Sequence, residues 1–378
     1  MTLPMNFHDF RPADGTDPDP ILAAVPGLLG FVPEQSVVLV IFDHDAKVLA
    51  TLRHDLMFSA SGAPHPELCE TFAQVGASMP LYDAAGAVLV VVDERFDVLD
   101  PLPAMNSYRR IVACADEAFA EAGGVAAGFA MRSVAAGSPW HAFWQPDDMP
   151  ARAVPCLFDT EFLSCGRLSD PETSSVALDR AVQTGRRVMR RRSDIPAMLR
   201  PIGHCTDEVC RSSRPVAARG PRSTADRGRL GWVIDRIEAG DPPSRCVDVD
   251  RAADAITSVH VRDALLGLAV TGLRPAAEQV WCMLTRRLTG TAGAAAATLL
   301  GHLYYAGGEG VYAGVVLEHA LSEDPDYRLA DLLFTALTNG MHPSDMGGLV
   351  ELSFEVAADL GRPLPPLAAW PGQDRSAG

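Results

Sequence analysis

Two unbroken apolar runs in the first hundred residues constrain the fold of this chain more than any other feature. They are SVVLVIFD at 36–43 and AGAVLVVVDE at 85–94, both rich in β-branched residues. Runs without polar alternation are typical of strands that are covered on both faces of a sheet. AKVLATLR follows the first run directly after HD, which indicates a hairpin. With helical patterns between the strands, residues 19–150 are predicted to form an α/β domain with a mixed sheet.

The strand pattern disappears beyond about residue 150, and helical periodicity replaces it. The fold class is therefore α/β plus all-α. We predict five segments: a flexible N-terminus at 1–18, the α/β domain at 19–150, a helical connector with an Arg-rich segment at 151–248, a helical-repeat-like domain at 249–362 and a tail at 363–378.

One window in the helical part, LLGHLYYAGGEGVYAGVVLEHALSEDPDY at 299–327, resembles a tetratricopeptide hairpin. The small residues Gly301 and Ala320 and the bulky Tyr304 and Leu317 fall at the template's offsets. Neighbouring windows match less well. We expect three hairpins stacked over 259–360, which would present a concave groove of the kind that binds peptides. The alternative is an ordinary helical bundle in which the match is accidental.

Charge and composition exclude several classes of function. The formal net charge is -16, so the surface as a whole repels nucleic acid and anionic membranes. Lys47 is the only lysine, which excludes a phosphate-binding loop of the Gly-Lys-Ser/Thr type. The chain has neither an apolar run long enough for a membrane span nor a signal-peptide pattern at its start. We therefore predict a cytoplasmic protein with reduced cysteines, no membrane association and no cofactor.

Positive charge is concentrated in residues 180–229, which hold thirteen Arg against four acidic residues. If helical periodicity continues to 191, one face within about 140° carries four of these arginines, namely Arg186, Arg187, Arg190 and Arg191. Guanidinium groups bind carboxylates and phosphates in a forked geometry. We predict that these four bind an acidic segment of a protein partner. Nucleic acid is a weaker alternative, because 211–229 has no aromatic residue for base stacking. A further alternative is that the segment neutralises acidic parts of the same chain.

Acidic residues follow both apolar runs: Asp43 ends the first, and Asp93 and Glu94 end the second. If the two strands are parallel, these carboxylates meet at one edge of the sheet, where open α/β sheets place ligands. They would then hold a divalent cation and activate water, as in a metal-dependent hydrolase or a nucleotide-handling enzyme. The alternative is that they are solvated turn residues. No other metal site is predicted.

Four segments carry a resemblance to a known family. They are ILAAVPGLLGFVPEQSVVLVIF at 21–42, LSDPETSSVALDRAVQTGR at 168–186, HVRDALLGLA at 260–269 and LEHALSEDPDYRLADLL at 317–333. In this order they resemble an actinobacterial group, the domain of unknown function DUF4192. The family has no assigned activity, so the resemblance implies none. We expect a non-catalytic interaction or regulatory protein, with the enzyme as the alternative.

Overall fold

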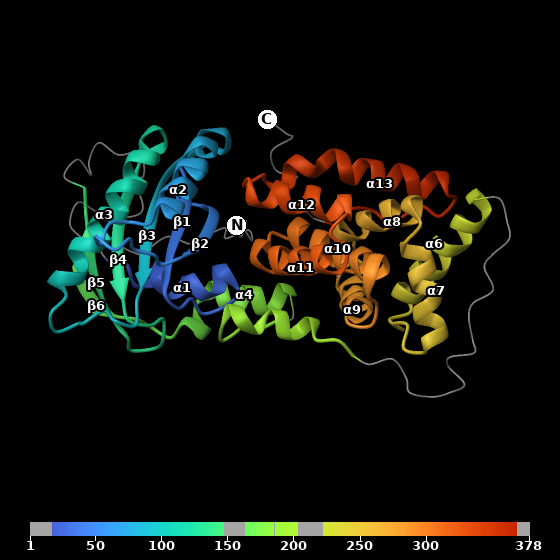
Figure 1. The fold of residues 1–378 in the computed structure, drawn as a ribbon, viewed down its shortest axis with the longest axis horizontal. Helices are drawn as coiled ribbons and strands as arrows, with labels where there is room; N and C mark the ends of the chain where they lie inside the picture. The colour runs from blue at the N-terminus through green and yellow to red at the C-terminus, as the bar shows by residue number, and fades with distance from the viewer. Residues whose placement is uncertain (1–16, 147–162, 185, 203–221, 369–378) are drawn as a thin grey trace. The chain divides into compact units, whose positions relative to one another are not determined.

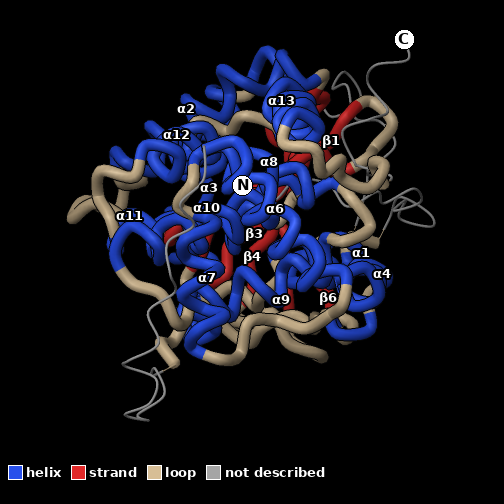
Figure 2. The backbone as a smooth tube through the Cα atoms, turned by 90° about the vertical axis from the view of Figure 1, so that its right-hand side faces the viewer, coloured by secondary structure: helices blue, strands red, loops and turns tan. Residues whose placement is uncertain are grey.

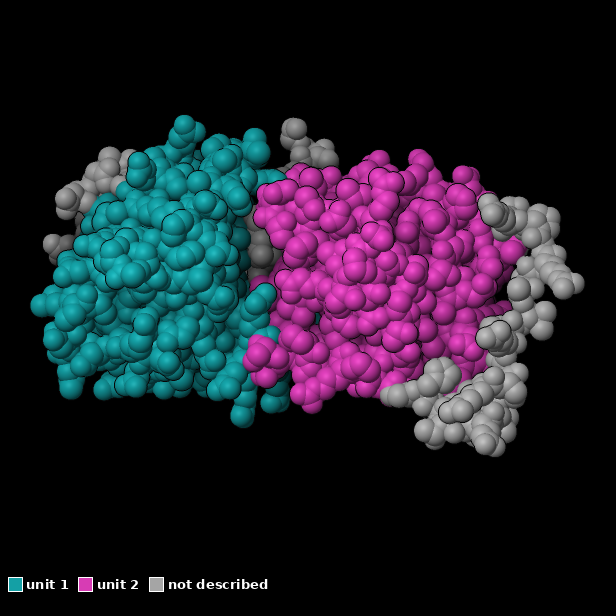
Figure 3. Space-filling model, viewed as in Figure 1, with its two compact units in different colours: residues 1–192 teal, residues 193–378 magenta. Residues whose placement is uncertain are grey.

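The computed structural model describes residues 17–146, 163–184, 186–202 and 222–368. The chain divides into two compact units, residues 1–192 and 193–378 (Figure 3). The boundary between the two units, at residues 192 and 193, falls within the connector predicted at 151–248, so the connector is not a separate unit. Its residues 151–162, 185 and 203–221 lie outside the described residues, as do most of the predicted N-terminus and much of the predicted tail.

The described part of the first unit contains a mixed six-stranded sheet with strand order β2-β1-β3-β4-β5-β6 (Figure 1). Its strands are β1 (Ser36–Asp43), β2 (Val48–Asp55), β3 (Ala84–Val92), β4 (Val125–Met131), β5 (Pro139–Trp144) and β6 (Cys165–Arg167). Only the β3–β4 pair is parallel. The helices are α1 (Asp19–Leu29), α2 (Pro66–Ser78), α3 (Leu102–Ala118) and α4 (Ser175–Thr184). The predicted mixed α/β domain is confirmed.

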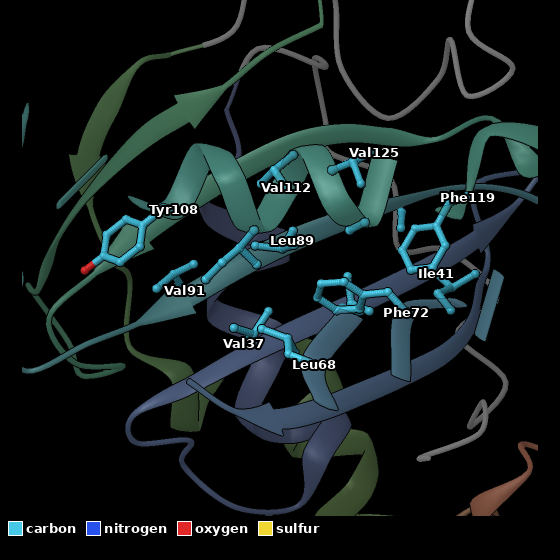
Figure 4. Close-up of a cluster of buried hydrophobic side chains, with 14 of the residues drawn as sticks. Val37, Ile41, Leu68, Phe72, Leu89, Val91, Tyr108, Val112, Phe119 and Val125 are labelled. Carbon is cyan, nitrogen blue, oxygen red and sulfur yellow. The ribbon is translucent and has the colours of Figure 1, made fainter. Parts of the chain in front are cut away.

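The central strands are buried on both faces, as their unbroken apolar sequences require. On β1, Val37, Leu39 and Ile41 point into a core that includes Leu68 and Phe72 of α2 (Figure 4). Side chains from α3 complete this core: Tyr108, Ile111, Val112 and Ala115. The alternate residues of β1, Val38, Val40 and Phe42, face the opposite side and are also buried. Burial of each such side chain contributes about 1.5–3 kcal/mol.

The described part of the second unit is helical, and its helices are drawn in blue in Figure 2. They are α6 (Arg222–Glu238), α7 (Cys246–Ile256), α8 (Val259–Leu266), α9 (Arg274–Thr285), α10 (Gly290–Ala306), α11 (Gly310–Glu323), α12 (Arg328–Thr338) and α13 (Gly347–Asp359), with the short turns η7 (Gly267–Val270) and η8 (Pro343–Met346). Every residue of α10 from Gly293 to Ala306 is buried. Because α10 is apolar on all sides, it lies at the centre and contacts α7, α8, α9, α11 and α12.

The predicted hairpin is formed by α10 and α11. A Cβ atom added to Gly301 would lie 2.8 Å from the Leu317 side chain, so the glycine permits the close approach. The rings of Tyr304 and Tyr312 meet edge to face with centroids 5.6 Å apart. Ala320 is fully buried. The sequence therefore located this helix pair correctly.

The expected open stack of three hairpins needs correction. In a stack each hairpin contacts only its neighbours, whereas α13 packs against α8 and η7. A Cβ added to Gly267 of η7 would lie 3.2 Å from Ser353 and 3.3 Å from Phe354, both on α13. The last described helix thus returns to the start of the predicted stack. This is the closed arrangement of a helical bundle, the alternative to the stack.

Candidate functional site

The segment that carries the four predicted binding arginines is extended rather than helical. Helix α4 ends at Thr184. Met189 forms a parallel bridge with Phe31. Its N–H donates to the carbonyl of Gly30 at 2.9 Å, and its carbonyl accepts from the N–H of Val32 at 2.9 Å. The prediction of a helix up to residue 191 is wrong, so the four arginines do not share a helical face. The sequence contained a signal for the end of this helix, because glycine commonly follows the last residue of a helix and Gly185 follows Thr184.

The environments of these arginines differ. Arg187 and Arg190 are exposed, and the described residues supply neither of them with a hydrogen-bond or ion-pair partner. The Arg191 guanidinium donates from Nε to Glu34 Oε1 at 3.2 Å, with both side chains more than half exposed. Arg186 is half-buried and engaged in other interactions. An exposed pair such as Arg191–Glu34 contributes at most about 1 kcal/mol.

Positive charge extends from this segment to the neighbouring strand β2. Arg53 donates from Nε to Ser36 Oγ at 2.7 Å and forms an ion pair with Asp55. Burial lowers the pKa of Arg53, the Asp55 carboxylate partly opposes this, and the nearby charge of Arg192 lowers the pKa further. Arg53 and Arg192 therefore lie close enough for their positive charges to interact, although the effect of Asp55 is larger. We call residues 186–192 the arginine segment.

The predicted carboxylate site does not assemble. Strand β1 is antiparallel to β3, with Ser36 opposite Val92 and Asp43 opposite Ala84. Asp43 therefore lies at the opposite end of the sheet from Asp93, more than about 20 Å away along strands of this length. The Asp43 carboxylate accepts hydrogen bonds at Oδ1 from the N–H groups of Asp45 and Lys47 in the hairpin turn. The expectation of one site shared by Asp43, Asp93 and Glu94 is wrong.

Asp93, which is itself buried, is instead the centre of a clamp at the end of β3 whose Arg95 side chain is exposed. Its Oδ1 accepts from Arg95 Nε at 2.9 Å, and its Oδ2 accepts from Arg95 Nη2 at 3.0 Å and from the Tyr108 hydroxyl at 3.1 Å. Burial alone would raise the pKa of Asp93, but the Arg95 and Tyr108 hydrogen bonds and the Arg95 charge hold it below its usual value. Burial and the Asp93 charge raise the pKa of Tyr108. The clamp joins β3 to α3, and Glu94 beside it is exposed.

Within the described ranges, no group of three or more His, Cys, Asp or Glu is arranged to hold a metal ion. His204, Cys205 and Cys210, which stand close together in the sequence, lie outside those ranges. Sequence analysis missed both partners of Asp93: the Asp-x-Arg spacing at 93–95 is a local signal for Arg95, whereas no local signal marks Tyr108. No helix in the part of the chain that the structure describes is long and apolar enough to cross a membrane.

A six-stranded mixed sheet followed by a closed helical bundle defines this as a two-unit protein of α/β and all-α parts. The model of the family DUF4192, a domain of unknown function, matches residues 18–344. The chain therefore belongs to the DUF4192 family, as its motifs indicated. Neither the curated proteins nor the solved structures contain a match to it.

Proposed function

We propose that this protein is a non-catalytic cytoplasmic interaction protein that binds an acidic segment of a partner protein through Arg187 and Arg190. The observation that carries this proposal is that both side chains are exposed without an ion-pair partner among the described residues. Their backbone is held by the two hydrogen bonds at Met189. An anchored backbone loses less conformational entropy on binding than a free one.

An acidic peptide fits these arginines better than a nucleic acid does. The net charge of -16 opposes the approach of a long polyanion. The arginine segment, RRVMRRR, contains no aromatic side chain on which a base could stack. A short run of Asp or Glu residues needs only a few guanidinium partners, which this segment supplies.

The enzyme alternative depended on a carboxylate site shared by the ends of β1 and β3, and this site does not form. Asp43 and Asp93 lie at opposite ends of the sheet, and Asp93 is occupied by Arg95 and Tyr108. The groove of a tetratricopeptide stack is likewise no support for partner binding, because α13 closes the helical bundle onto α8. The proposal therefore depends on the arginine segment alone.

Fluorescence anisotropy with a labelled Glu-rich octapeptide tests this proposal, with a labelled 20-base-pair DNA duplex as the competing probe. The variant is Arg187→Glu with Arg190→Glu. The matched control is Arg110→Glu with Arg132→Glu, which reverses two other exposed arginines of the same unit and changes the net charge equally. We expect the first variant to weaken peptide binding about tenfold, or about 1.4 kcal/mol, and the control to change it less than twofold.

Equal losses in both variants would show that only the overall charge matters. Unchanged peptide binding in Arg187→Glu/Arg190→Glu would remove the arginine segment as the docking site. Tighter binding of the duplex than of the peptide, with a steep dependence on salt, would favour the nucleic-acid alternative.

A further inference from the structure

The arginine segment runs beside the stretch of chain that leads into β1, and the two are joined by the parallel bridge between Met189 and Phe31. Arg191 stands two residues beyond the bridge on one side, and Glu34 stands three residues beyond it on the other. Both stretches leave the bridge in the same direction. Arg191 and Glu34 therefore lie side by side, with the guanidinium Nε 3.2 Å from Glu34 Oε1.

The backbone at Glu34 is held in place by its neighbours. Its carbonyl oxygen accepts hydrogen bonds from Ser36 Oγ at 2.6 Å and from Arg53 Nη2 at 3.3 Å. The next residue, Gln35, has a φ of 44°, in the left-handed region that residues other than glycine rarely adopt. Such a backbone persists only where surrounding contacts enforce it. The Glu34 carboxylate is thus presented to the arginine segment from a fixed backbone position.

The two side chains of this ion pair are nevertheless open to solvent. The Arg191 side chain is 64% exposed and the Glu34 side chain 58% exposed. Water screens such a pair, so that the contact shifts an equilibrium by no more than about fivefold. A carboxylate from another molecule can therefore reach the same guanidinium and replace Glu34 at a small cost. The exchange leaves Arg191 paired with one carboxylate before and after.

This ion pair adjoins the two arginines to which docking is assigned. Arg191 directly follows Arg190 in the chain, and the Cα atoms of adjacent residues are about 3.8 Å apart. An acidic segment bound at Arg187 and Arg190 therefore brings its further carboxylates within reach of Arg191. Glu34 is the residue that such a carboxylate has to displace.

We propose that Arg191 is a third docking residue and that Glu34 occupies it until a carboxylate of the partner takes its place. This inference rests on the proposed function, in which Arg187 and Arg190 bind an acidic segment. The contact with Glu34 also identifies the chemical group that the position accepts, namely the planar carboxylate of an Asp or Glu side chain. Because Glu34 competes with the partner, it sets a threshold for binding: a segment has to supply enough carboxylates to replace it.

A double-mutant cycle tests the proposal on the full-length chain, with the labelled Glu-rich octapeptide and fluorescence anisotropy. The single variants are Glu34→Gln, which removes the competing charge at nearly constant shape, and Arg191→Gln. In the wild type the peptide has to displace Glu34, whereas in Glu34→Gln the guanidinium is released from this contact. We expect Glu34→Gln to bind the peptide about two- to fivefold more tightly, the upper value being the full effect of an exposed ion pair.

The double variant separates occupation of Arg191 from a general effect of charge. If Glu34 acts by occupying Arg191, the substitution Glu34→Gln should change the affinity by less than about 1.5-fold when Arg191→Gln is already present. Arg191→Gln should in turn weaken binding more in the Glu34→Gln background than in the wild type. The matched control is Glu70→Gln at an exposed position on α2, which changes the net charge equally and should alter binding by less than about 1.5-fold.

Equal or weaker peptide binding by Glu34→Gln, with binding that still requires Arg187 and Arg190, overturns this proposal and leaves the proposed function standing. The same gain from Glu34→Gln with and without Arg191 also overturns it, because Glu34 would then act only as a nearby negative charge. Absence of peptide binding in both the wild type and Glu34→Gln overturns the proposed function and this inference with it. Circular dichroism verifies that every variant is folded.

Discussion

His302 provides the sharpest test of the helical unit, because it is a titratable residue on the central helix α10. Its side chain is 1% exposed. Burial lowers the pKa of the imidazole to about 4, and the nearby backbone of Leu266 opposes the shift only in part. The folded protein therefore holds His302 neutral, whereas the unfolded chain protonates it near the ordinary value of 6.5.

The sign of the effect follows from proton binding. Between pH 6.5 and pH 4 the unfolded state binds a proton that the folded state excludes, so acid favours unfolding. The contribution of neutral His302 to stability is present above pH 6.5 and is lost as the pH falls toward 4. From pH 7 to pH 5 this linkage lowers the free energy of unfolding by about 2 kcal/mol, and by about 3 kcal/mol in total at lower pH. That is a large part of the 5–15 kcal/mol typical of a domain.

Urea unfolding followed by circular dichroism at pH 7, 6 and 5 measures the effect in wild type and in His302→Leu. Leucine has a similar volume and does not titrate. We expect the wild type to lose about 2 kcal/mol more than the variant between pH 7 and pH 5. His260→Leu, at an exposed position on α8, controls for the loss of a histidine as such. Parallel pH dependences in wild type and His302→Leu would refute the reasoning.

Three further changes test the packing and the clamp. Gly301→Ala should destabilise the protein by about 1–3 kcal/mol in urea unfolding, because the added methyl group overpacks against Leu317. In the control Gly314→Ala, the added Cβ would make an ordinary contact at 3.6 Å, so the higher helix propensity of alanine should stabilise the protein by up to about 1 kcal/mol. Similar effects at both sites would contradict the helix packing. Tyr108→Phe removes the hydroxyl that donates to Asp93 and should cost about 1–2 kcal/mol, which thermal melting measures. Asp93→Asn should lower Tm without altering the change of Tm on addition of Mn²⁺. Because the Asp93 pKa is held below its ordinary value of 3.8, the wild type should also lose more stability than this variant below pH 4. A melting shift with Mn²⁺ that the variant abolishes would restore a metal role for Asp93.

Strands β1 and β3 could be predicted because their sequences allow little else. Runs predicted at 36–43 and 85–94 appear as Ser36–Asp43 and Ala84–Val92. Uninterrupted β-branched residues with turn residues at both ends favour a doubly covered strand wherever they occur. The hairpin after β1 was equally local, since its turn residues follow the strand directly.

The relative direction of β1 and β3 was predicted incorrectly, which removed the carboxylate site. This direction is set by the connections between the strands and not by the residues within them. The hairpin makes β2 antiparallel to β1, and the crossover through α2 returns β3 parallel to β2. Once β3 lies beside β1, the pair must be antiparallel, and Asp43 and Asp93 must separate. No single residue encodes this outcome. The extended conformation of the arginine segment was missed because the helical periodicity was continued across Gly185.

Closure of α13 onto α8 restricts how the helical unit can change in length. An open array lengthens by adding a copy at its end and survives the loss of its last copy, since each unit depends only on its neighbours. Here η7 beside α8 contacts Ser353 and Phe354, about ninety positions further along the sequence. Removing α13 would therefore expose α8 and η7 to water. A helical unit closed in this way changes by substitution of residues at constant length, and not by duplication of a repeat.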